Sequence, residues 1–191
     1  SKNEELADIY GVVMGYSHHE PCLRASEEWD KVRGPETEYG NEWNFYTNEK
    51  GLVNYWRDAL KRSGKYENLI TIGMRGDGDT AMGGKEGHDD EYTPDYEGIM
   101  KLMYKIIDNQ RKIIKDVTGK PAKKRPQVWA LYKEVQLLYD KGLRVPDDVI
   151  LLLSDDNWGD VRRLPNAEER KHPGGWGMYY HVDYVGAPRN T

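Results

Sequence analysis

The chain has 191 residues and a formal net charge of −5, with 37% hydrophobic and 32% charged residues. Its apolar residues are gathered into short blocks, so we expect one globular domain, residues 1–191, rather than a disordered chain. The scattered basic residues argue against a nucleic-acid partner, and the lack of an apolar run of roughly 20 residues argues against a membrane-spanning segment.

The first apolar block in chain order covers residues 9–14, and the next covers residues 69–74. Both predict β-strands, because continuous apolar character is typical of strands covered on both faces of a sheet. Between them lies a long polar loop, residues 32–48, and then a helical pattern. In this pattern apolar residues recur at helix spacing from 52 to 60, and Gly64 supplies a C-terminal cap.

A second long polar loop, residues 80–92, precedes the longest helical pattern, which begins near Pro94 and ends at Gly119. A shorter helix follows Glu134 and closes at Gly142. The remaining apolar blocks, which also predict strands, comprise residues 127–132, 149–153 and 178–182. Because strands and helices alternate in this way, the sequence predicts an α/β fold with about five parallel strands and intervening helices.

Ionisable side chains follow every predicted strand. They lie in residues 17–20, 75–79, 133–134 and 154–158 and, at the last strand, at His181, Asp183 and Tyr184. In barrels and open parallel sheets the active site forms where the carboxyl ends of the strands meet. We therefore expect these groups to converge on one cleft.

The carboxylates Asp77, Asp79 and Glu134 are candidates for the general acid and base of glycosidic hydrolysis. The local sequence leaves open that Asp77 and Asp79 belong to a polar turn held by glycines. Arg75 and Lys133 stand beside these acids, and each cation could form a structural ion pair or bind a substrate carboxylate. A site for a uronic acid requires both cations and acids, and this combination is present.

The pair His18 and His19, followed by Glu20, raises the question of a metal site. Adjacent strand residues point to opposite faces, and the sequence here has no HExxH-type spacing of the kind that binds zinc. We therefore expect one histidine to bond a sugar hydroxyl. A structural role is the alternative. The run 76–79 fits neither a calcium loop nor a phosphate cradle. We therefore expect no metal at these residues.

The aromatic residues are mostly rings with a polar group, with 14 Tyr and 6 Trp against 1 Phe. Such rings suit sugar-binding clefts, although they also serve in half-buried packing. Trp158, next to Asn157, is either a stacking platform or a residue that packs a loop against the rim.

The order of these motifs resembles glycoside hydrolase family 115 over nearly the whole chain. The matching stretches comprise residues 10–15, 17–21, 71–79, 126–136, 145–148, 154–159 and 179–186. The resemblance implies the central part of the catalytic TIM (β/α)8 barrel of a xylan α-glucuronidase. Such an enzyme removes α-1,2-linked glucuronic acid, or its 4-O-methyl ether, from glucuronoxylan by inverting hydrolysis, without a required cofactor.

Carried over by motif position, the resemblance implies that Asp79 and Glu134 are the catalytic carboxylates, and it leaves open which is the acid. The expected substrate contacts are His19, Arg75, Asp77, Lys133, Asn157, Trp158, His181 and Tyr184. Inverting geometry places the two catalytic carboxyl groups roughly 6.5 to 9.5 Å apart. The resemblance also implies a secreted or periplasmic parent bacterial enzyme, although the first residues of this chain are no signal peptide.

Family members are several-domain proteins with a complete barrel, so the chain is expected to supply about five of the eight strand units. Unpaired sheet edges would then favour homo-oligomers, and the missing strands predict little or no activity for the isolated chain. Two alternatives stay open. One is a fragment that binds acidic sugars without catalysis, and the other is a cation-dependent phosphohydrolase with Asp77, Asp79, Asp155 and Asp156 as ligands.

Overall fold

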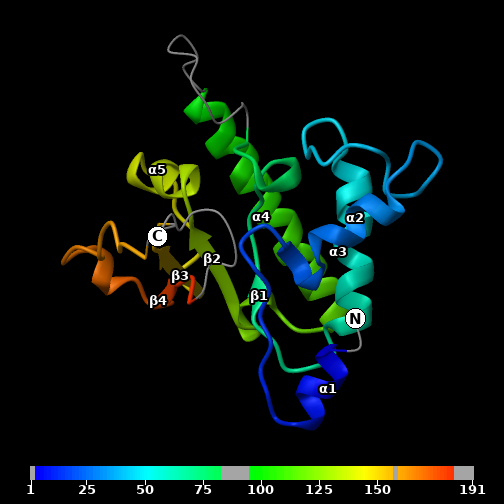
Figure 1. Cartoon of the computed structure of the whole chain (residues 1–191), viewed down its shortest axis with the longest axis horizontal. Coiled ribbons are helices and arrows are strands. Elements are labelled where there is room, and N and C mark those ends of the chain that lie inside the picture. Colours follow the sequence, from blue (N-terminus) through cyan, green and yellow to red (C-terminus); the bar gives the residue numbers. More distant parts are fainter. Residues whose placement is uncertain (1–2, 83–94, 157–158, 183–191) are drawn as a thin grey trace, which may run out of the picture. The chain divides into compact units, whose positions relative to one another are not determined.

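The computed structural model describes residues 3–82, 95–156 and 159–182 (Figure 1). The chain divides into two compact units, Ser1–Gln127 and Val128–Thr191, and each is described by itself. That residues 1–191 form one domain of a barrel therefore stays a prediction. Within the described residues, no helix has the length and apolar character needed to cross a membrane.

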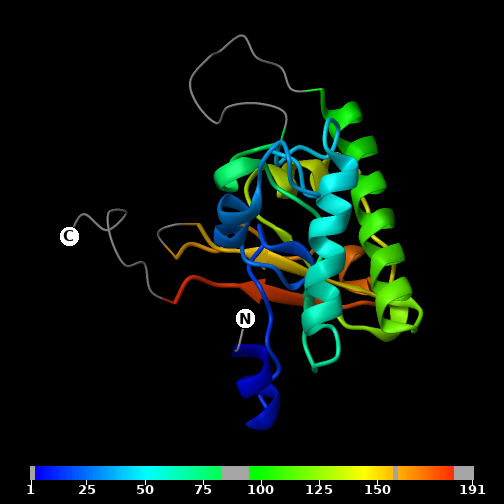
Figure 2. The same cartoon turned by 90° about the vertical axis from the view of Figure 1, so that its right-hand side faces the viewer.

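The first unit contains the longer helices. Its elements are α1 (Asn3–Ile9), α2 (Ser26–Val32), α3 (Glu49–Ser63), β1 (Ile70–Thr71) and α4 (Tyr96–Thr118), with short 3-10 turns at Pro21–Leu23, Asp77–Asp79 and Ala122–Lys124. Helices α3 and α4 lie side by side (Figure 2). The side chains of Trp56 on α3 and Ile106 on α4 are fully buried, so the apolar faces predicted from helix spacing form the core of this unit.

Local signals explain where α4 begins and ends. The Asp95 side chain accepts a hydrogen bond from the backbone N–H of Gly98, which caps the first turn. Gly119 follows the last turn with φ +68°, a left-handed conformation that glycine adopts without strain. The predictions of this helix and of α3 are confirmed.

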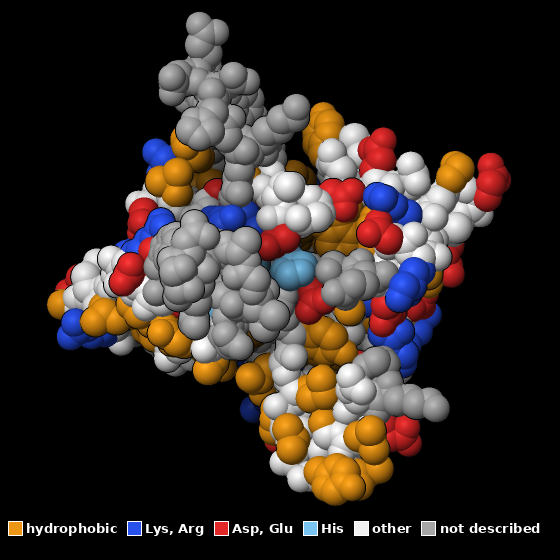
Figure 3. Space-filling view, viewed as in Figure 1, with side chains coloured by type: hydrophobic (Ala, Val, Ile, Leu, Met, Phe, Trp, Pro, Cys, Tyr) orange, Lys and Arg blue, Asp and Glu red, His pale blue; other side chains and the backbone are white. Residues whose placement is uncertain are grey.

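The prediction of a strand at residues 9–14 is wrong. Residues up to Ile9 belong to α1, and only Met14 forms a parallel bridge, to Asn68. The apolar side chains in this stretch are exposed, and Figure 3 shows hydrophobic side chains over α1 and the segment that follows it. Without a partner strand, apolar character alone did not produce an extended conformation.

A buried glutamine attaches α4 to the backbone just after β1. Gln110 is 0% exposed, and its Oε1 accepts from the N–H of Gly73 at 2.7 Å while its Nε2 donates to the Gly73 carbonyl at 2.8 Å. Gly73 has φ +88°, which bends the chain here. This clamp fixes the backbone that leads to Arg75.

Replacing Gln110 with Leu is expected to lower the free energy of unfolding by about 3 kcal/mol. The substitution keeps the volume but leaves the N–H and the carbonyl of Gly73 buried without their partner, at about 1–3 kcal/mol for each group. Urea unfolding measures the change. Asn109→Leu is the matched control, because the Asn109 amide donates to the Lys105 carbonyl on the same helix. This variant should stay within about 1 kcal/mol of wild type.

The second unit carries the remaining strands. Its elements are β2 (Gln127–Leu131, whose first residue belongs to the first unit), α5 (Glu134–Asp140), β3 (Val149–Ser154), a 3-10 turn at Glu169–Lys171 and β4 (Trp176–Tyr179). The strands are neighbours in the order β2-β3-β4, and β3 pairs with β4 in parallel, with Leu151 opposite Trp176. All of β2 is buried, as its continuous apolar sequence predicts.

The last strand begins and ends earlier than predicted. β4 covers Trp176–Tyr179 instead of 178–182, so His181 lies beyond its carboxyl end. The strands β2 and β3 and the short helix after Glu134 are confirmed, with shifts of one or two residues at their ends. The strand predicted at residues 69–74 forms only at Ile70–Thr71 and ends three residues earlier than predicted. The parallel strands with intervening helices confirm the predicted α/β fold.

Candidate functional site

The first candidate site lies in the turn that follows β1. The backbone N–H of Gly76 donates to the Thr80 carbonyl at 2.7 Å and closes the turn. A Cβ on Gly76 would meet the Thr80 side chain at 2.7 Å, so this tight closure requires glycine. Asp79 adopts φ +63°, an uncommon conformation for a non-glycine residue. Strained positions of this kind cluster at functional sites.

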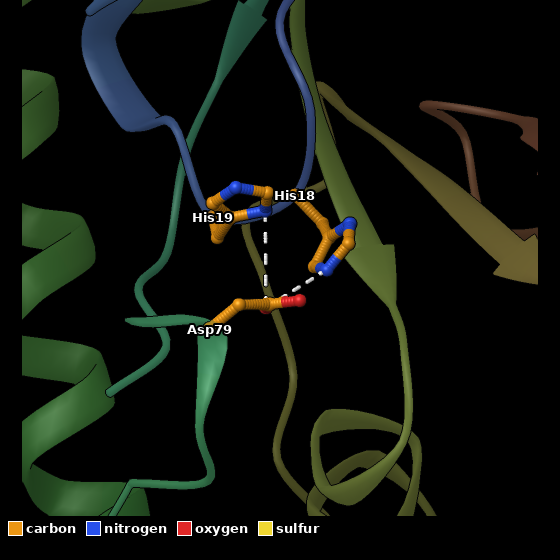
Figure 4. A group of neighbouring side chains, drawn as sticks. All are labelled: His18, His19 and Asp79. Atoms are coloured by element: carbon orange, nitrogen blue, oxygen red, sulfur yellow. Dashed lines mark hydrogen bonds and ion pairs between the residues drawn. The ribbon is translucent and has the colours of Figure 1, made fainter. Parts of the chain in front are cut away.

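Three basic side chains face the Asp79 carboxylate. Nε2 of His18 lies 3.0 Å from its Oδ1, and Nδ1 of His19 lies 3.8 Å from the same atom (Figure 4). The Arg75 guanidinium donates to Oδ1 and also to the backbone carbonyl of Asp79. Arg75 is 2% exposed, and the indole N–H of Trp43 holds its carbonyl at 3.0 Å. Arg75 therefore acts as a buried partner of Asp79.

These partners decide the charge of Asp79. Burial raises the pKa of Asp79, but the hydrogen bond and charge of His18 and those of Arg75 outweigh burial and lower the pKa to about 2. The carboxylate is therefore ionised over the whole ordinary pH range. Burial lowers the pKa of His19, and the raising effect of the Asp79 charge does not offset it. A neutral His19 can donate or accept a hydrogen bond from a hydroxyl group.

Both histidines reach Asp79 because the backbone turns at residues 18–19, where the N–H of Glu20 donates to the Ser17 carbonyl. A straight strand would have separated the two rings. His18, His19 and Asp79 place one ligand atom each within 4.8 Å of one another, a group that could hold a cation. The Arg75 guanidinium on the same carboxylate opposes a second positive charge there. That this site takes no metal stays a prediction.

Asp77 points away from this cluster. Its carboxylate lies 3.1 Å from the guanidinium of Arg33, and its side chain is 57% exposed. A cavity of about 120 Å³ opens beside the turn, lined by His19, Trp29, Asp30, Trp43, Gly76, Asp77, Gly78 and Asp79. Asp79 thus has basic partners together with an opening large enough for a small polar group.

The second candidate site lies in the other unit, where β2 ends. Lys133 has φ 47° and ψ −118°, a strained conformation that links the strand directly to α5. Glu134 is the first residue of α5, where the partial positive charge of the helix terminus favours a carboxylate. The Lys133 ammonium is exposed and lies 5.4 Å from the centre of the Tyr132 ring.

A buried carboxylate holds His181 at the carboxyl end of this sheet. The Asp155 side chain is 0% exposed, and its Oδ1 lies 2.7 Å from Nδ1 of His181. The backbone N–H of His181 also donates to both carboxylate oxygens at 3.3 Å. A cavity of about 220 Å³ lies here, lined by Tyr132, Lys133, Gln136, Ser154, Asp155, Asp156 and Arg162. Lys133 and Arg162 offer positive charge to an anionic group here, beside Asp155, which bonds His181, and Asp156, which lies 3.5 Å from Arg162.

The structure thus assembles Arg75, Asp79 and His19 in one unit, and Lys133, Glu134 and His181 at the strand ends of the other. Asn157, Trp158 and Tyr184 lie outside the described residues. The predicted catalytic and substrate-binding residues did not include His18, Asp155 or Arg162, although Asp155 was named as a ligand in the phosphohydrolase alternative. The signal for His18 was its place in a histidine pair, and that for Asp155 its place directly after a strand, whereas Arg162 follows no strand end.

The model of Glycosyl hydrolase family 115 matches residues 1–191. No curated protein matches the chain. Among solved structures, the chain is similar to a family GH115 4-O-methyl-α-glucuronidase, BtGH115A, which has specificity for decorated arabinogalactans. The TM-score is 0.80 and the identity 36%, over 99% of this chain and 23% of that one.

This likeness agrees with the α/β fold and fits a partial barrel. The chain spans less than a quarter of the length of the solved relative, at 23%. Both comparisons agree with the resemblance found in the order of the motifs.

Proposed function

This chain belongs to glycosyl hydrolase family 115, and on that premise we propose that its protein releases glucuronic acid, or the 4-O-methyl ether, from glucuronoxylan. The proposed reaction is inverting hydrolysis of the α-1,2 linkage by Asp79 and Glu134. The observation that carries the proposal is the ionised Asp79 carboxylate, held by Arg75 and His18 beside an open cavity.

We assign Asp79 as the general base. A carboxylate that is ionised at rest can take the proton of the attacking water, whereas a general acid must arrive protonated. Binding of a uronate beside Asp79 would raise its pKa through like-charge repulsion and so increase its basicity. Arg75 and His18 then act as positioning residues, because both are buried and bond the reacting carboxylate.

Because Asp79 is assigned as the base, we assign Glu134 as the general acid that protonates the leaving sugar oxygen. Lys133 and Arg162 supply positive charge for the carboxylate of the uronic acid, and His181, oriented by Asp155, supplies a hydrogen bond. We propose the remaining predicted contacts, Asn157, Trp158 and Tyr184, on the resemblance alone. These roles need no bound metal or organic cofactor.

A second candidate substrate comes from the solved relative, which has specificity for decorated arabinogalactans. Incubation of the whole protein with glucuronoxylan and with decorated arabinogalactan, followed by chromatography of the released sugars, distinguishes the two. Release of glucuronic acid or its 4-O-methyl ether from either polymer supports the proposed activity. Binding of the polymers without release would support the non-catalytic alternative instead.

We further propose that the purified chain of residues 1–191 has little or no activity. A barrel site draws its residues from several strand ends, and the chain spans only 23% of its solved relative. The assay compares glucuronic acid release by this chain and by the whole protein at equal molar concentration. Release by the chain at a rate close to that of the whole protein would contradict the proposal.

Two further expectations stand as proposals. The parent protein is secreted or periplasmic, because its polymeric substrate lies outside the cytoplasm. The isolated chain forms homo-oligomers through unpaired sheet edges, which light scattering of the purified chain tests directly.

A further inference from the structure

A larger cavity lies beside the Asp79 site in the first unit. Its volume is about 510 Å³, against about 120 Å³ for the cavity that contains Asp79. The two share Trp43, Gly76 and Asp77 in their linings, so they are neighbouring parts of one surface. The roles proposed above leave the larger cavity without a ligand.

Aromatic rings form one wall of this larger cavity. Tyr46 is 84% exposed, whereas Trp43 and Phe45, which also line the cavity, are buried beneath the surface. Tyr46 lines the cavity but is exposed to solvent, so its ring is not part of the packed core. Its flat face and its hydroxyl group suit contact with a sugar ring.

The loop that carries Tyr46 is tied down by its own hydrogen bonds. The Asn44 side chain accepts from the N–H of Tyr46 at 2.9 Å, and the Asn44 carbonyl accepts from the N–H of Asn48 at 2.8 Å. The Asn48 amide in turn donates to the carbonyls of Tyr39 and Glu42. A loop held in this way loses little backbone entropy when a ligand binds.

The charge of the lining indicates which kind of sugar fits. The described residues that line the cavity include Asp77 and Asp95 but no lysine or arginine. Two carboxylates disfavour a second uronic acid and can accept hydrogen bonds from sugar hydroxyls. The cavity at Lys133 and Arg162 also contains two carboxylates, Asp155 and Asp156, but it offers cations beside them.

We infer that this cavity is a subsite for a neutral sugar of the polysaccharide, next to the glucuronosyl unit, with Tyr46 as its stacking platform. The inference rests on the proposed function for the identity of the neighbouring unit. The cavity would make the protein bind a decorated oligosaccharide more tightly than glucuronic acid alone.

Calorimetry on the whole protein tests the inference in a Glu134→Gln background, in which turnover of the ligand is slowed. The two ligands are free glucuronic acid and a neutral xylo-oligosaccharide that carries one glucuronic acid branch. Tyr46→Ala is expected to weaken binding of the oligosaccharide about three- to tenfold more than binding of glucuronic acid, and Tyr46→Trp to restore it. Tyr10→Ala, which removes a ring that is 79% exposed elsewhere in the unit, should change neither affinity.

If Tyr46→Ala binds the oligosaccharide as tightly as the protein that keeps Tyr46, the subsite is overturned. An equal loss of affinity for the oligosaccharide and for glucuronic acid would overturn it as well. These outcomes are separate from a failure of the proposed function, which shows as no sugar release by the wild-type protein. Loss of oligosaccharide affinity in Tyr46→Ala supports the subsite even if no release is seen.

Discussion

Replacement of Asp79 by Asn is expected to lower kcat for glucuronic acid release by about a thousandfold, within the 10²–10⁴ range typical of general base catalysis. The amide keeps the shape of the side chain and its contact with His18, but it cannot take a proton from the attacking water. The loss should be similar for a polysaccharide and for an aryl glucuronide, because the base acts on the water in both reactions. Initial rates with both substrates measure it.

Asp116→Asn is the matched control, because Asp116 on α4 is an exposed partner of Arg57 on α3, and this variant should keep wild-type rates. A loss of less than about tenfold in Asp79→Asn would contradict the assignment of the base.

Protonation of Asp79 also changes the stability of the fold, since its pKa of about 2 lies below the ordinary value of 3.8. Its stabilising effect is complete above the ordinary value and is lost as the pH falls through about 2.

Replacement of Glu134 by Gln is expected to lower kcat/KM on glucuronoxylan by about a hundredfold or more, because the leaving sugar oxygen then departs without a proton. An aryl glucuronide with an acidic phenol needs little help from a general acid. Its kcat/KM should therefore fall much less. The ratio of the two losses, taken from initial rates at the same pH, measures the role of Glu134.

Glu97→Gln on α4 is the control for this substitution, because its carboxylate is exposed and pairs with Lys101 one turn away on the same helix. Equal losses on the two substrates would contradict the role of Glu134 as the acid. A loss in Asp79→Asn that is much larger on glucuronoxylan than on the aryl glucuronide, together with equal losses in Glu134→Gln, would exchange the two roles.

Much of the fold follows from local signals in the sequence. The helix α4 begins at an aspartate cap and ends at a left-handed glycine, and its apolar residues recur on one face, so its bounds could be predicted closely. β2 and β3 were predictable because continuous apolar blocks mark buried strands. Residues 9–14 carry a similar apolar signal, but strand formation needs a partner, and only Met14 finds one.

The sequence predicts which residues belong to the candidate site better than it predicts the contacts between them. Clusters after strands pointed to Asp79 and Lys133, since parallel strands bring their carboxyl ends to one edge. The sequence alone could not show that Arg75 is buried or that its carbonyl accepts from Trp43, which lies more than thirty residues away. The contact between His18 and Asp79 depends on a backbone turn, and two adjacent histidines in the sequence do not predict such a turn.

The anomeric form of the first product tests the account most directly. The whole protein is mixed with glucuronoxylan, or with the decorated arabinogalactan if that is the better substrate, and proton NMR spectra are recorded before mutarotation. Inverting hydrolysis by Asp79 and Glu134 predicts that the β-anomer of glucuronic acid, or of its 4-O-methyl ether, appears first. Early accumulation of the α-anomer, or no release of either sugar, would contradict the account.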